Sequence, residues 1–307
     1  AGTVNETLRS YSGYPTARVM VHNMLALSYL FNDDISGARV EMLQADIAMK
    51  KLASKNHLNG QLASTHLMTG IIYELLDEQS NALISYKHAE KLVKARNLPI
   101  PIGLKEALLR LSYAVDRKGQ YISYKKRYGG LATPIKKGNS QIFSLYFDGI
   151  VSNKIENSIA VPSGNGEQII RISMPAYQSI NYPIGHAELV NAKQQSATEL
   201  VENLDHLVRE DLDNEYPSIL FLTTTRALAK YELVEYAGEK DDFLGLLVNL
   251  ATILTEIADL RSWNMLPSNI QFGYLETDET EFIINTSNQK QQKISINRGS
   301  KNVVLIS

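Results

Sequence analysis

The sequence predicts an α+β fold, with helical hairpins at the N-terminus and a mixed domain with antiparallel strands after them. Apolar residues recur at helical spacing through about the first 130 residues, separated by polar turns and one proline-rich loop. Beyond Gly129-Gly130, short segments alternate between apolar and polar residues, as half-buried strands do. We therefore expect a helical domain over residues 1–130 and an α+β domain over residues 131–307.

Each helix of the N-terminal domain is predicted from an apolar stripe that lies between two polar breaks. In the second helix, for example, Val40, Leu43 and Ile47 follow one another at helical spacing. The predicted helices span Val19–Phe31, Ile35–Ala53, Leu62–Leu76, Asn81–Ala95 and Leu104–Tyr128, and a break near Lys118-Gly119 divides the last span into two.

The first two helical hairpins share a pattern of small and large residues. Its internal spacings of 3, 9, 4 and 3 are the same in both copies, which lie 44 residues apart. The two sets are Ala26, Tyr29, Ala38, Met42 and Ala45, and Gly70, Tyr73, Ala82, Tyr86 and Ala89. The pattern resembles the tetratricopeptide repeat, in which small residues let two antiparallel helices approach closely. The copies depart from that family in their spacing, since its repeat is about 34 residues long.

The second domain is predicted to hold strands within residues 141–174, helices within residues 192–262 and strands within residues 271–306. The first of these helices carries an apolar stripe from Leu200 to Leu212 and should end at Pro217, because proline removes a backbone donor. The second should span Ile219–Ala237 and the third should reach about Ser262. The most apolar run, Phe243–Ala258, is interrupted by polar residues and is too short for a membrane span, so we expect a buried helix.

Composition excludes several classes of function. The chain has 31 Lys and Arg against 33 Asp and Glu, a net charge of −2 that gives no general attraction for nucleic acid. It has no cysteine, which excludes disulfides, thiolate nucleophiles and Cys-ligated zinc. The motifs HExxH, GxSxG and GxxxxGK[ST] are absent. His22 and His66 hold equivalent places in the two repeats and are expected to pack rather than to bind metal. We therefore predict no catalytic residue, no cofactor and no metal site.

One local cluster admits two interpretations. Asp259, Arg261 and Trp263 lie together at the end of the predicted helical block. Arg261 beside an aromatic ring is typical of a site for a carboxylate or phosphate ligand, or for a partner. The structural alternative is that Trp263 fills the core while Asp259 and Arg261 pair with each other.

Three segments resemble a known family. Met24–Ala48, Arg226–Lys230 and Ala258–Trp263 with the following Leu266-Pro267 are similar, in this order, to an uncharacterised family of Gram-negative envelope proteins with tetratricopeptide-like repeats. The resemblance implies a periplasmic protein, an outer-membrane lipoprotein whose lipidated Cys lies upstream of residue 1. It also implies gene neighbours that include the lipoprotein activators of penicillin-binding proteins, and it implies no catalytic residue.

The leading functional prediction is a non-catalytic interaction module or scaffold that supports cell-wall synthesis or surface assembly, with an envelope protein or peptide as its partner. By analogy to the repeat, six residues of the first helices of the two hairpins should face a concave binding groove. They are Asn23, Leu27, Leu30, Leu67, Ile71 and Glu74. In a second interpretation, the chain's own α+β domain covers this groove. Two other functions stay open: a hydrolase or transferase for cell-wall glycan or peptide, and a cytosolic repeat adaptor.

Overall fold

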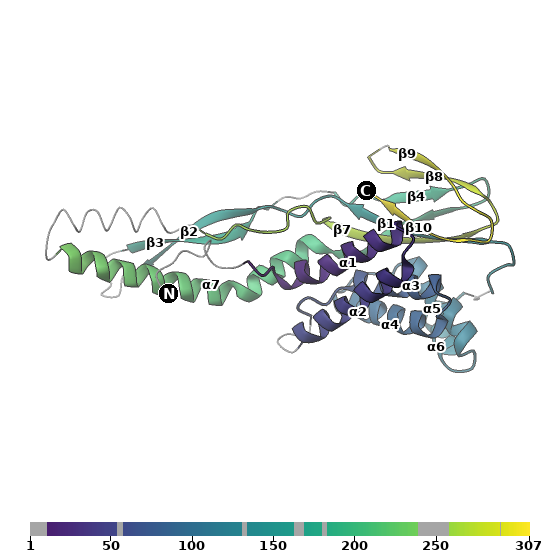
Figure 1. Ribbon diagram of the computed structural model, residues 1–307, viewed down its shortest axis with the longest axis horizontal. Coiled ribbons are helices and arrows are strands. Elements are labelled where there is room, and N and C mark those ends of the chain that lie inside the picture. The colour runs from purple at the N-terminus through teal and green to yellow at the C-terminus, as the bar shows by residue number, and fades with distance from the viewer. Residues whose placement is uncertain are drawn as a thin grey trace. The chain divides into compact units, whose positions relative to one another are not determined.

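A computed structural model describes residues 11–53, 58–130, 134–162, 169–179, 183–238, 258–288 and 290–307 (Figure 1). It confirms the α+β class, because helices fill the N-terminal part and antiparallel and mixed sheets follow. Backbone contacts divide the chain into two compact units. The first holds Ala1–Tyr14, Ser152–Ile180 and Val208–Asn264, and the second holds Pro15–Val151, Asn181–Leu207 and Met265–Ser307. These units do not follow the predicted boundary at residue 130, since the N-terminal helices and most strands belong to one unit.

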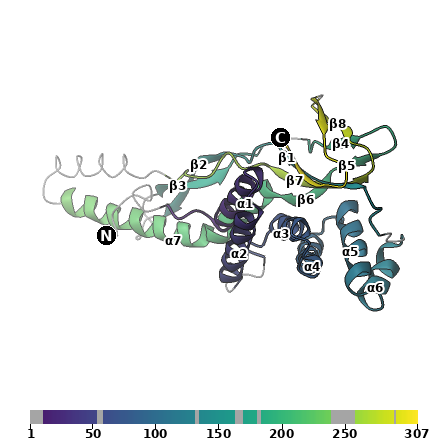
Figure 2. The same ribbon diagram turned by 45° about the vertical axis from the view of Figure 1, so that its right-hand side comes forward.

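The N-terminal helices form three hairpins in a row, as the apolar stripes predicted (Figure 2). We call them hairpin 1, hairpin 2 and hairpin 3. Hairpin 1 consists of α1 (Pro15–Phe31) and α2 (Ile35–Leu52), hairpin 2 of α3 (Ala63–Leu75) and α4 (Gln79–Ala95), and hairpin 3 of α5 (Ile102–Val115) and α6 (Gln120–Tyr128).

The backbone of hairpin 1 repeats in hairpin 2. Asp33 and Asp77, which are 44 residues apart, both take a left-handed conformation, with φ of 58° and 60°. The residue after each aspartate donates its N–H to the carbonyl of a tyrosine five residues earlier, at N···O distances of 2.9 Å and 2.8 Å. Asn97 at the end of α4 has the same conformation, with φ of 56°, so this turn is a helix end that α1, α3 and α4 share. A repeat of the tetratricopeptide family stays a prediction.

Two four-stranded sheets belong to the same unit as the hairpins. The first sheet has the order β10 (Lys301–Ile306), β1 (Ser140–Asp148), β7 (Asn269–Thr277) and β6 (Glu199–Asn203), with β1 parallel to β10 and antiparallel to β7. The second has the order β5 (Gln195–Ala197), β4 (Ala187–Val190), β8 (Glu281–Thr286) and β9 (Gln291–Ser295).

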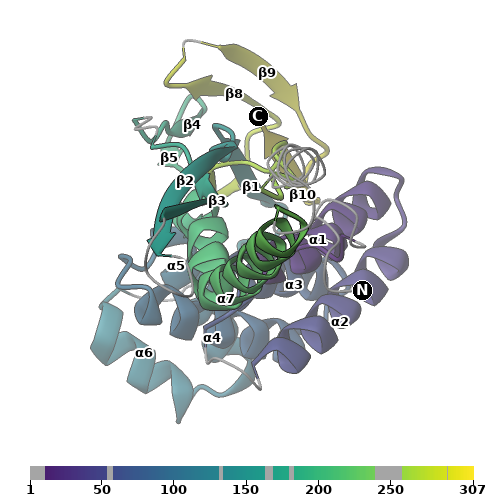
Figure 3. The same cartoon turned by 90° about the vertical axis from the view of Figure 1, so that its left-hand side faces the viewer.

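A buried core lies between the two sheets and includes Ile142, Tyr146, Leu189 and Phe282. The β8–β9 hairpin lies on the side of β1 away from α3 and α4 (Figure 3). The order of layers in this unit is therefore helices, first sheet and second sheet, so the helices depend on the first sheet for part of their burial.

The other unit pairs one long helix with one antiparallel ribbon. β2 (Lys154–Pro162) and β3 (Ile169–Tyr177) form the ribbon, and most of α7 (Leu204–Gly238) belongs to the same unit. Ile172 and Met174 of β3 are buried with Ala227 of α7. No described helix is both long and apolar enough to cross a membrane.

The helical prediction over residues 192–262 needs two corrections. First, residues 195–203 form β5 and β6, so helix α7 begins at Leu204, where Asn203 accepts a hydrogen bond from the His206 N–H at 2.9 Å. Second, α7 continues through Pro217. The carbonyl that this proline leaves unpaired belongs to the exposed Asp213, where water can reach it, and Tyr216 and Ile219 pack on the core around Met174.

The remaining predictions for the second domain have mixed outcomes. Strands within 141–174 and 271–306 are confirmed as β1 to β3 and β7 to β10. The short strands β4 and β5 were not predicted. The third predicted helix falls mainly on residues 239–257, outside the described residues, and Ala258–Ser262 is not helical.

Candidate functional site

The predicted binding groove is covered. Leu30 is half-buried, and the other five residues are core residues, namely Asn23, Leu27, Leu67, Ile71 and Glu74. Asn23 exchanges hydrogen bonds with Thr65 at 2.9 and 3.0 Å, which joins α1 to α3. The prediction that these side chains face a partner is therefore wrong for the five buried residues. The second interpretation, a groove covered by the chain itself, is the one that agrees with this burial.

Two carboxylates of β6 attach helices to the first sheet. Glu202, which is buried, accepts hydrogen bonds from the N–H of Ser64 at 3.0 Å and from its hydroxyl at 3.3 Å. It thereby caps α3, whose own preceding residue Leu62 offers no side-chain acceptor. Burial raises the pKa of Glu202 to about 7, although the hydrogen bonds from Ser64 act in the opposite direction. Glu199 accepts a hydrogen bond from Ile102 at the start of α5.

Glu74 belongs to a buried ion pair that joins three helices and a strand. Its carboxylate accepts hydrogen bonds from both terminal nitrogens of Arg110 and, at 2.9 Å, from the hydroxyl of Tyr86. The Arg110 guanidinium lies 4.9 Å from the centre of the Tyr274 ring on β7. Burial and the charge of Glu74 raise the pKa of Tyr86. The Glu74 carboxylate, the two terminal nitrogens of Arg110 and the Tyr86 hydroxyl are engaged with one another, while the buried Arg110 Nε has no hydrogen-bond partner among the described residues. The paired groups join α3, α4 and α5 to β7 and hold the fold together.

The cluster of Asp259, Arg261 and Trp263 is also internally paired. Arg261 donates to both oxygens of Asp259, at 2.8 and 2.7 Å, and its guanidinium lies 5.3 Å from the centre of the Tyr11 ring. The pairing agrees with the structural interpretation. Trp263 is half-buried rather than enclosed in the core. A ligand site here stays a prediction, and Asp259 and Arg261 pair their charges with each other.

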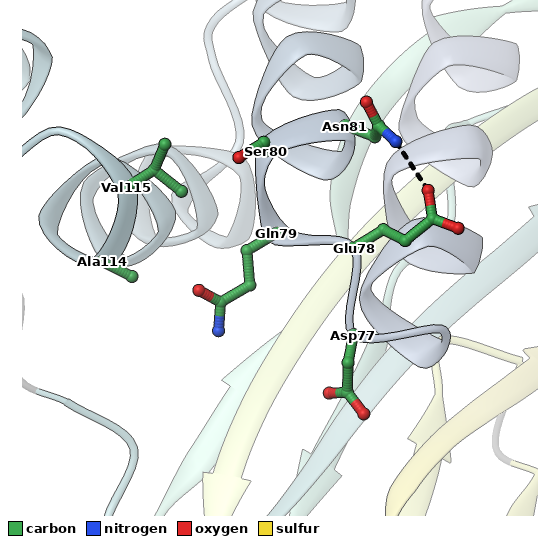
Figure 4. Close-up of a pocket in the computed structure, with 7 residues that line it drawn as sticks. All are labelled: Asp77, Glu78, Gln79, Ser80, Asn81, Ala114 and Val115. Carbon is green, nitrogen blue, oxygen red and sulfur yellow. Dashed lines mark hydrogen bonds between the residues drawn. The ribbon is translucent and has the colours of Figure 1, made fainter.

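The hollow of about 490 Å³ between the start of α4 and the end of α5 is open and polar (Figure 4). Its two carboxylates are already paired. Glu78 forms an ion pair with Arg39 at 3.0 Å and accepts a hydrogen bond from the Asn81 side chain at 2.6 Å. Asp77 forms an ion pair with Lys301. The apolar part of the wall is small and comes from Ala114 and Val115. The hollow therefore lacks the apolar wall that usually encloses a small ligand.

A second polar cluster brings together residue types that occur in hydrolases, but their bonds are structural. Asp148 accepts from the Tyr146 hydroxyl at 3.0 Å and from the Gly185 N–H at 2.7 Å. Ser287 accepts from the backbone N–H of His186 at 3.1 Å. A Cβ on Gly185 would lie 2.7 Å from both the Asp148 carboxylate and the Ser287 hydroxyl, so only glycine fits. The bonds fix the segment before β4 against the end of β1.

The histidines do not form a metal site in the described part of the chain. Across it, no group of three or more His, Asp or Glu side chains is arranged to hold a metal ion. His66 and His88 stack edge to face with ring centres 5.0 Å apart, and His22 bonds to Glu41 at 2.8 Å. Burial, followed by the charge of His88, lowers the pKa of His66 to about 4. The pair therefore packs in its neutral form near neutral pH.

An exposed apolar surface on hairpin 1 is the strongest candidate for a functional site. Six large side chains on α1 and α2 are each 40% to 53% exposed. We call this surface the hairpin 1 face, and its members are Val21, Leu25, Tyr29, Val40, Leu43 and Ile47. A Cβ on Gly37 would lie 2.6 Å from the Tyr29 ring, so Tyr29 of α1 reaches across to α2 beside Val40. Val21, Leu25 and Tyr29 follow one another along α1, and Val40, Leu43 and Ile47 follow one another along the side of α2 opposite its buried residues. Exposed apolar stripes of this kind often mark interaction sites.

Hairpin 2 shows what the same positions do when they are covered. The residues 44 positions after Val21 and Leu25 are Thr65 and Thr69. Thr65 is buried and forms hydrogen bonds with Asn23 of α1. Tyr73 corresponds to Tyr29, and the guanidinium of Arg39 on α2 lies 5.6 Å from the centre of its ring. Val21, Leu25 and Tyr29 therefore lie at the positions whose equivalents in hairpin 2 face hairpin 1.

The α2 half of the hairpin 1 face has exposed equivalents in hairpin 2. Ile84 corresponds to Val40, and both are 53% exposed. Leu43 and Ile47 correspond to Lys87 and Lys91, which are exposed lysines. Helical spacing alone could not separate this stripe from the buried one on α2, but the lysines of the second copy mark these positions as solvent positions.

The opposite end of the row of hairpins is basic. Residues 87–137 contain thirteen Lys and Arg against three Asp and Glu, in a chain whose net charge is −2. In α6, Lys125, Lys126 and Arg127 are exposed. Stacked helical repeats need a polar outer face at each end to stay separate in solution. Hairpin 3 has such a face, and hairpin 1 has an apolar one.

No protein-family model matches the chain, and neither a curated protein nor a solved structure matches it.

Proposed function

We propose that the chain is a non-catalytic interaction module or scaffold of the bacterial cell envelope, in support of cell-wall synthesis or surface assembly. One observation carries the proposal, namely the hairpin 1 face, whose α1 positions are largely covered in hairpin 2 and whose Leu43 and Ile47 are replaced there by exposed lysines. The envelope location rests on the resemblance of Met24–Ala48 and two further segments to Gram-negative envelope proteins. No cofactor is part of the proposal.

Protein binding accounts for this surface better than the other ligands weighed. Apolar side chains at helical spacing suit a partner helix, because their burial stabilises a complex without any need for matched polar groups. A few central side chains usually contribute most of the affinity, and here Leu25 and Leu43, near the middles of α1 and α2, are the first candidates. Nucleic acid would instead need cations at the contact.

The experiment compares two surfaces of the same chain. Envelope extract from a Gram-negative bacterium is passed over immobilised parent protein and over two variants, Leu43→Glu on the hairpin 1 face and Ile84→Glu at an exposed position of hairpin 2. We expect partners to stay bound to the parent and to Ile84→Glu and to be lost from Leu43→Glu. Circular dichroism and thermal melting check that both variants are folded, as expected for exposed positions.

Two results would overturn the proposal. The same proteins bound equally by all three forms would remove the hairpin 1 face from the function. Turnover of purified peptidoglycan by the isolated protein, abolished by substitution of a single carboxylate, would show an enzyme instead of a scaffold.

A further inference from the structure

We propose that the exposed side of α6 binds the surface of an anionic lipid bilayer, with Ile122 entering the boundary between headgroups and acyl chains. The site lies in hairpin 3, so the proposal goes beyond the function assigned to hairpin 1 and does not depend on it. We call the site the α6 surface, and its members are all exposed, namely Arg117, Lys118, Ile122, Lys125, Lys126 and Arg127.

The α6 surface has an excess of cations. Residues 116–128 contain five Lys and Arg and one acidic residue, in a chain whose net charge is −2. The acidic residue, Asp116, accepts hydrogen bonds from the backbone N–H groups of Gly119 and Gln120, both at 3.0 Å, and so caps the start of α6. A polar end of a helical row can be built from charges of both signs, so this concentration of one sign needs a further reason.

Glu90 of α4 is the buried carboxylate that α6 contacts, and it is already surrounded by donors. It forms ion pairs with Lys94 and, at 2.8 Å, with Arg127, and it accepts a hydrogen bond from the Tyr128 hydroxyl. Two cations share this one carboxylate, so the group of ionised side chains around Glu90 has a net positive charge. Glu90 therefore does not neutralise the α6 surface.

The lysines of the α6 surface are available to a ligand. Among the described residues, Lys118, Lys125 and Lys126 are exposed and form no ion pair. Glu106 of α5 is within electrostatic range of two carboxylates on the first sheet, and it follows Gly103, which contacts that sheet, by three residues. It therefore lies on the side of α5 toward the sheet rather than beside these lysines.

Ile122 lies among the cations. It is 59% exposed, and Lys125 and Lys126 follow it by three and four residues, so all three side chains lie on one side of α6. Tyr124 and Tyr128 lie on the side toward α4, with their rings stacked 6.1 Å apart. Long lysine side chains can keep their charges at the headgroups of a bilayer while a shorter apolar side chain between them enters more deeply.

A bilayer explains this combination better than the other anionic partners. α6 lies at the outer corner of the row of hairpins, and no described element of its unit lies beyond it (Figures 2 and 3). A flat surface fits a projecting helix, whereas helical and extended peptides are usually bound in grooves or at sheet edges. Nucleic acid would pair with the cations but would offer Ile122 no apolar layer. Clusters of roughly four to eight Lys and Arg on an amphipathic helix are typical of sites for anionic headgroups.

Co-sedimentation of the purified full chain with lipid vesicles tests the proposal. One set of vesicles is pure phosphatidylcholine, and the other is an equal mixture of phosphatidylcholine and the anionic phosphatidylglycerol. We expect binding to the anionic vesicles alone, and weaker binding as the salt concentration rises. Equal binding to both kinds of vesicle, or binding to neither, overturns the proposal.

A pair of matched double variants tests the lysines. Lys125→Gln with Lys126→Gln should weaken binding to anionic vesicles by about twentyfold, since each lysine near such a surface contributes about fivefold. Lys50→Gln with Lys51→Gln changes the net charge equally and also removes two adjacent lysines from the last turn of a helix, and it should bind as the parent does. Parental binding by the first variant, or an equal loss in both, overturns the proposal.

A third variant tests the entry of Ile122 into the bilayer. Ile122→Ser should weaken binding to anionic vesicles by about fivefold and keep the salt dependence, because it removes apolar area and no charge. Binding as tight as that of the parent contradicts the proposed insertion. Circular dichroism checks that every variant is folded, as expected for exposed positions.

Soluble anions separate a bilayer from other partners. Inorganic phosphate, polyglutamate and a DNA duplex are each added as competitors at the same concentration of anionic groups as the vesicles. None should displace the protein, because none offers an apolar layer beneath its charges. Displacement by phosphate would reveal a site for the free ion, and displacement by polyglutamate or DNA would reveal a protein or nucleic-acid site; either result overturns the bilayer.

Discussion

Hairpin 1 and hairpin 2 have the same backbone turn, small residues at equivalent crossing positions and different surfaces. Asp33 and Asp77 turn the chain with nearly equal φ angles, and Ala38 and Ala82 are both fully buried. The exposed side of α2 nevertheless carries Leu43 and Ile47 where α4 carries Lys87 and Lys91. The shared residues are those that the fold requires, so the residues that differ need a reason outside the hairpin itself.

The two hairpins also differ in how they are attached. Hairpin 2 is capped by Glu202 from β6 and clamped by the Glu74–Arg110 pair beneath Tyr274 of β7. Hairpin 1 stands at the end of the row and contacts hairpin 2 through Asn23 and Arg39. Among the described residues, no helical hairpin lies on the outer side of α1, and its large apolar side chains there are exposed.

The largest expected effect is at the crossing of hairpin 2. A Cβ on Gly70 would lie 2.6 to 2.8 Å from the ring of Tyr86, whose hydroxyl is held by Glu74. Gly70→Leu should therefore cost about 3 kcal/mol of the free energy of unfolding, measured by chemical denaturation. The equivalent change in hairpin 1, Ala26→Leu, faces the more adaptable Met42 position and should cost less. Equal losses at the two positions would contradict the difference in packing that we infer.

Removal of the sheet carboxylate that caps α3 comes next. Glu202→Ala leaves the buried N–H of Ser64 without its acceptor, and we expect it to cost about 2 kcal/mol of the free energy of unfolding. Glu202→Gln, which keeps an acceptor oxygen, should lose less. Amide hydrogen exchange should show faster exchange at the start of α3 in Glu202→Ala. Unchanged protection there would mean that β6 does not cap hairpin 2.

A pH effect of similar size is expected from His66. The pKa of His66 is lowered to about 4 from an ordinary 6.5, so the unfolded chain binds the proton more tightly. Its contribution is fully present above pH 6.5 and is lost as the pH falls toward 4. At pH 5 the loss should be about 2 kcal/mol at most.

Thermal melting of variants isolates this contribution. The loss of melting temperature between pH 7.5 and pH 5 should be smaller in His66→Gln than in the parent. Ile84→Ser, whose exposed side chain carries no titratable group, should keep the parental loss. Because each variant is compared with the parent, other titrating groups such as Glu202 cancel. An identical acid loss in all three proteins would contradict the role of His66.

The smallest expected effect is on stability at the exposed stripe itself. Val40→Ser and Ile84→Ser should each change the free energy of unfolding of the monomer by less than about 0.5 kcal/mol, because both side chains are half exposed. A destabilisation of Val40→Ser in dilute solution beyond that size would place Val40 in the fold of the monomer rather than in an interface.

Much of this fold follows from local spacing. The six N-terminal helices and the 44-residue repeat appear in the sequence as apolar stripes and matched small residues, because helical periodicity and close crossings are local requirements. Two misassignments also have local causes. Leu200 and Val201 lie shortly before α7 and extend its apolar stripe. A proline usually ends a helix, but Pro217 is exposed to solvent inside α7 and the helix continues through it.

The site could not be placed in the same way. Leu67 and Ile71 form a clear stripe, but only the fold reveals that a sheet containing β6 and β7, more than 120 residues away, lies over hairpin 2. The sequence equally shows two apolar stripes on α2, one through Met42 and one through Leu43, without saying which is buried. The repeat held the missing signal, since Lys87 at the position equivalent to Leu43 identifies that stripe as the exposed one.

Site-specific cross-linking tests most directly whether hairpin 1 has a docking surface that hairpin 2 lacks. The chain has no cysteine, so Val40→Cys and Ile84→Cys each introduce a single thiol, at repeat-equivalent positions where the parent side chains are both 53% exposed. Each purified variant is labelled at its thiol with a photo-activated cross-linker, irradiated in envelope extract and examined by denaturing electrophoresis. We predict a covalent complex with a partner protein in high yield from Val40→Cys and only a trace from Ile84→Cys. Equal yields from the two positions would contradict the claim.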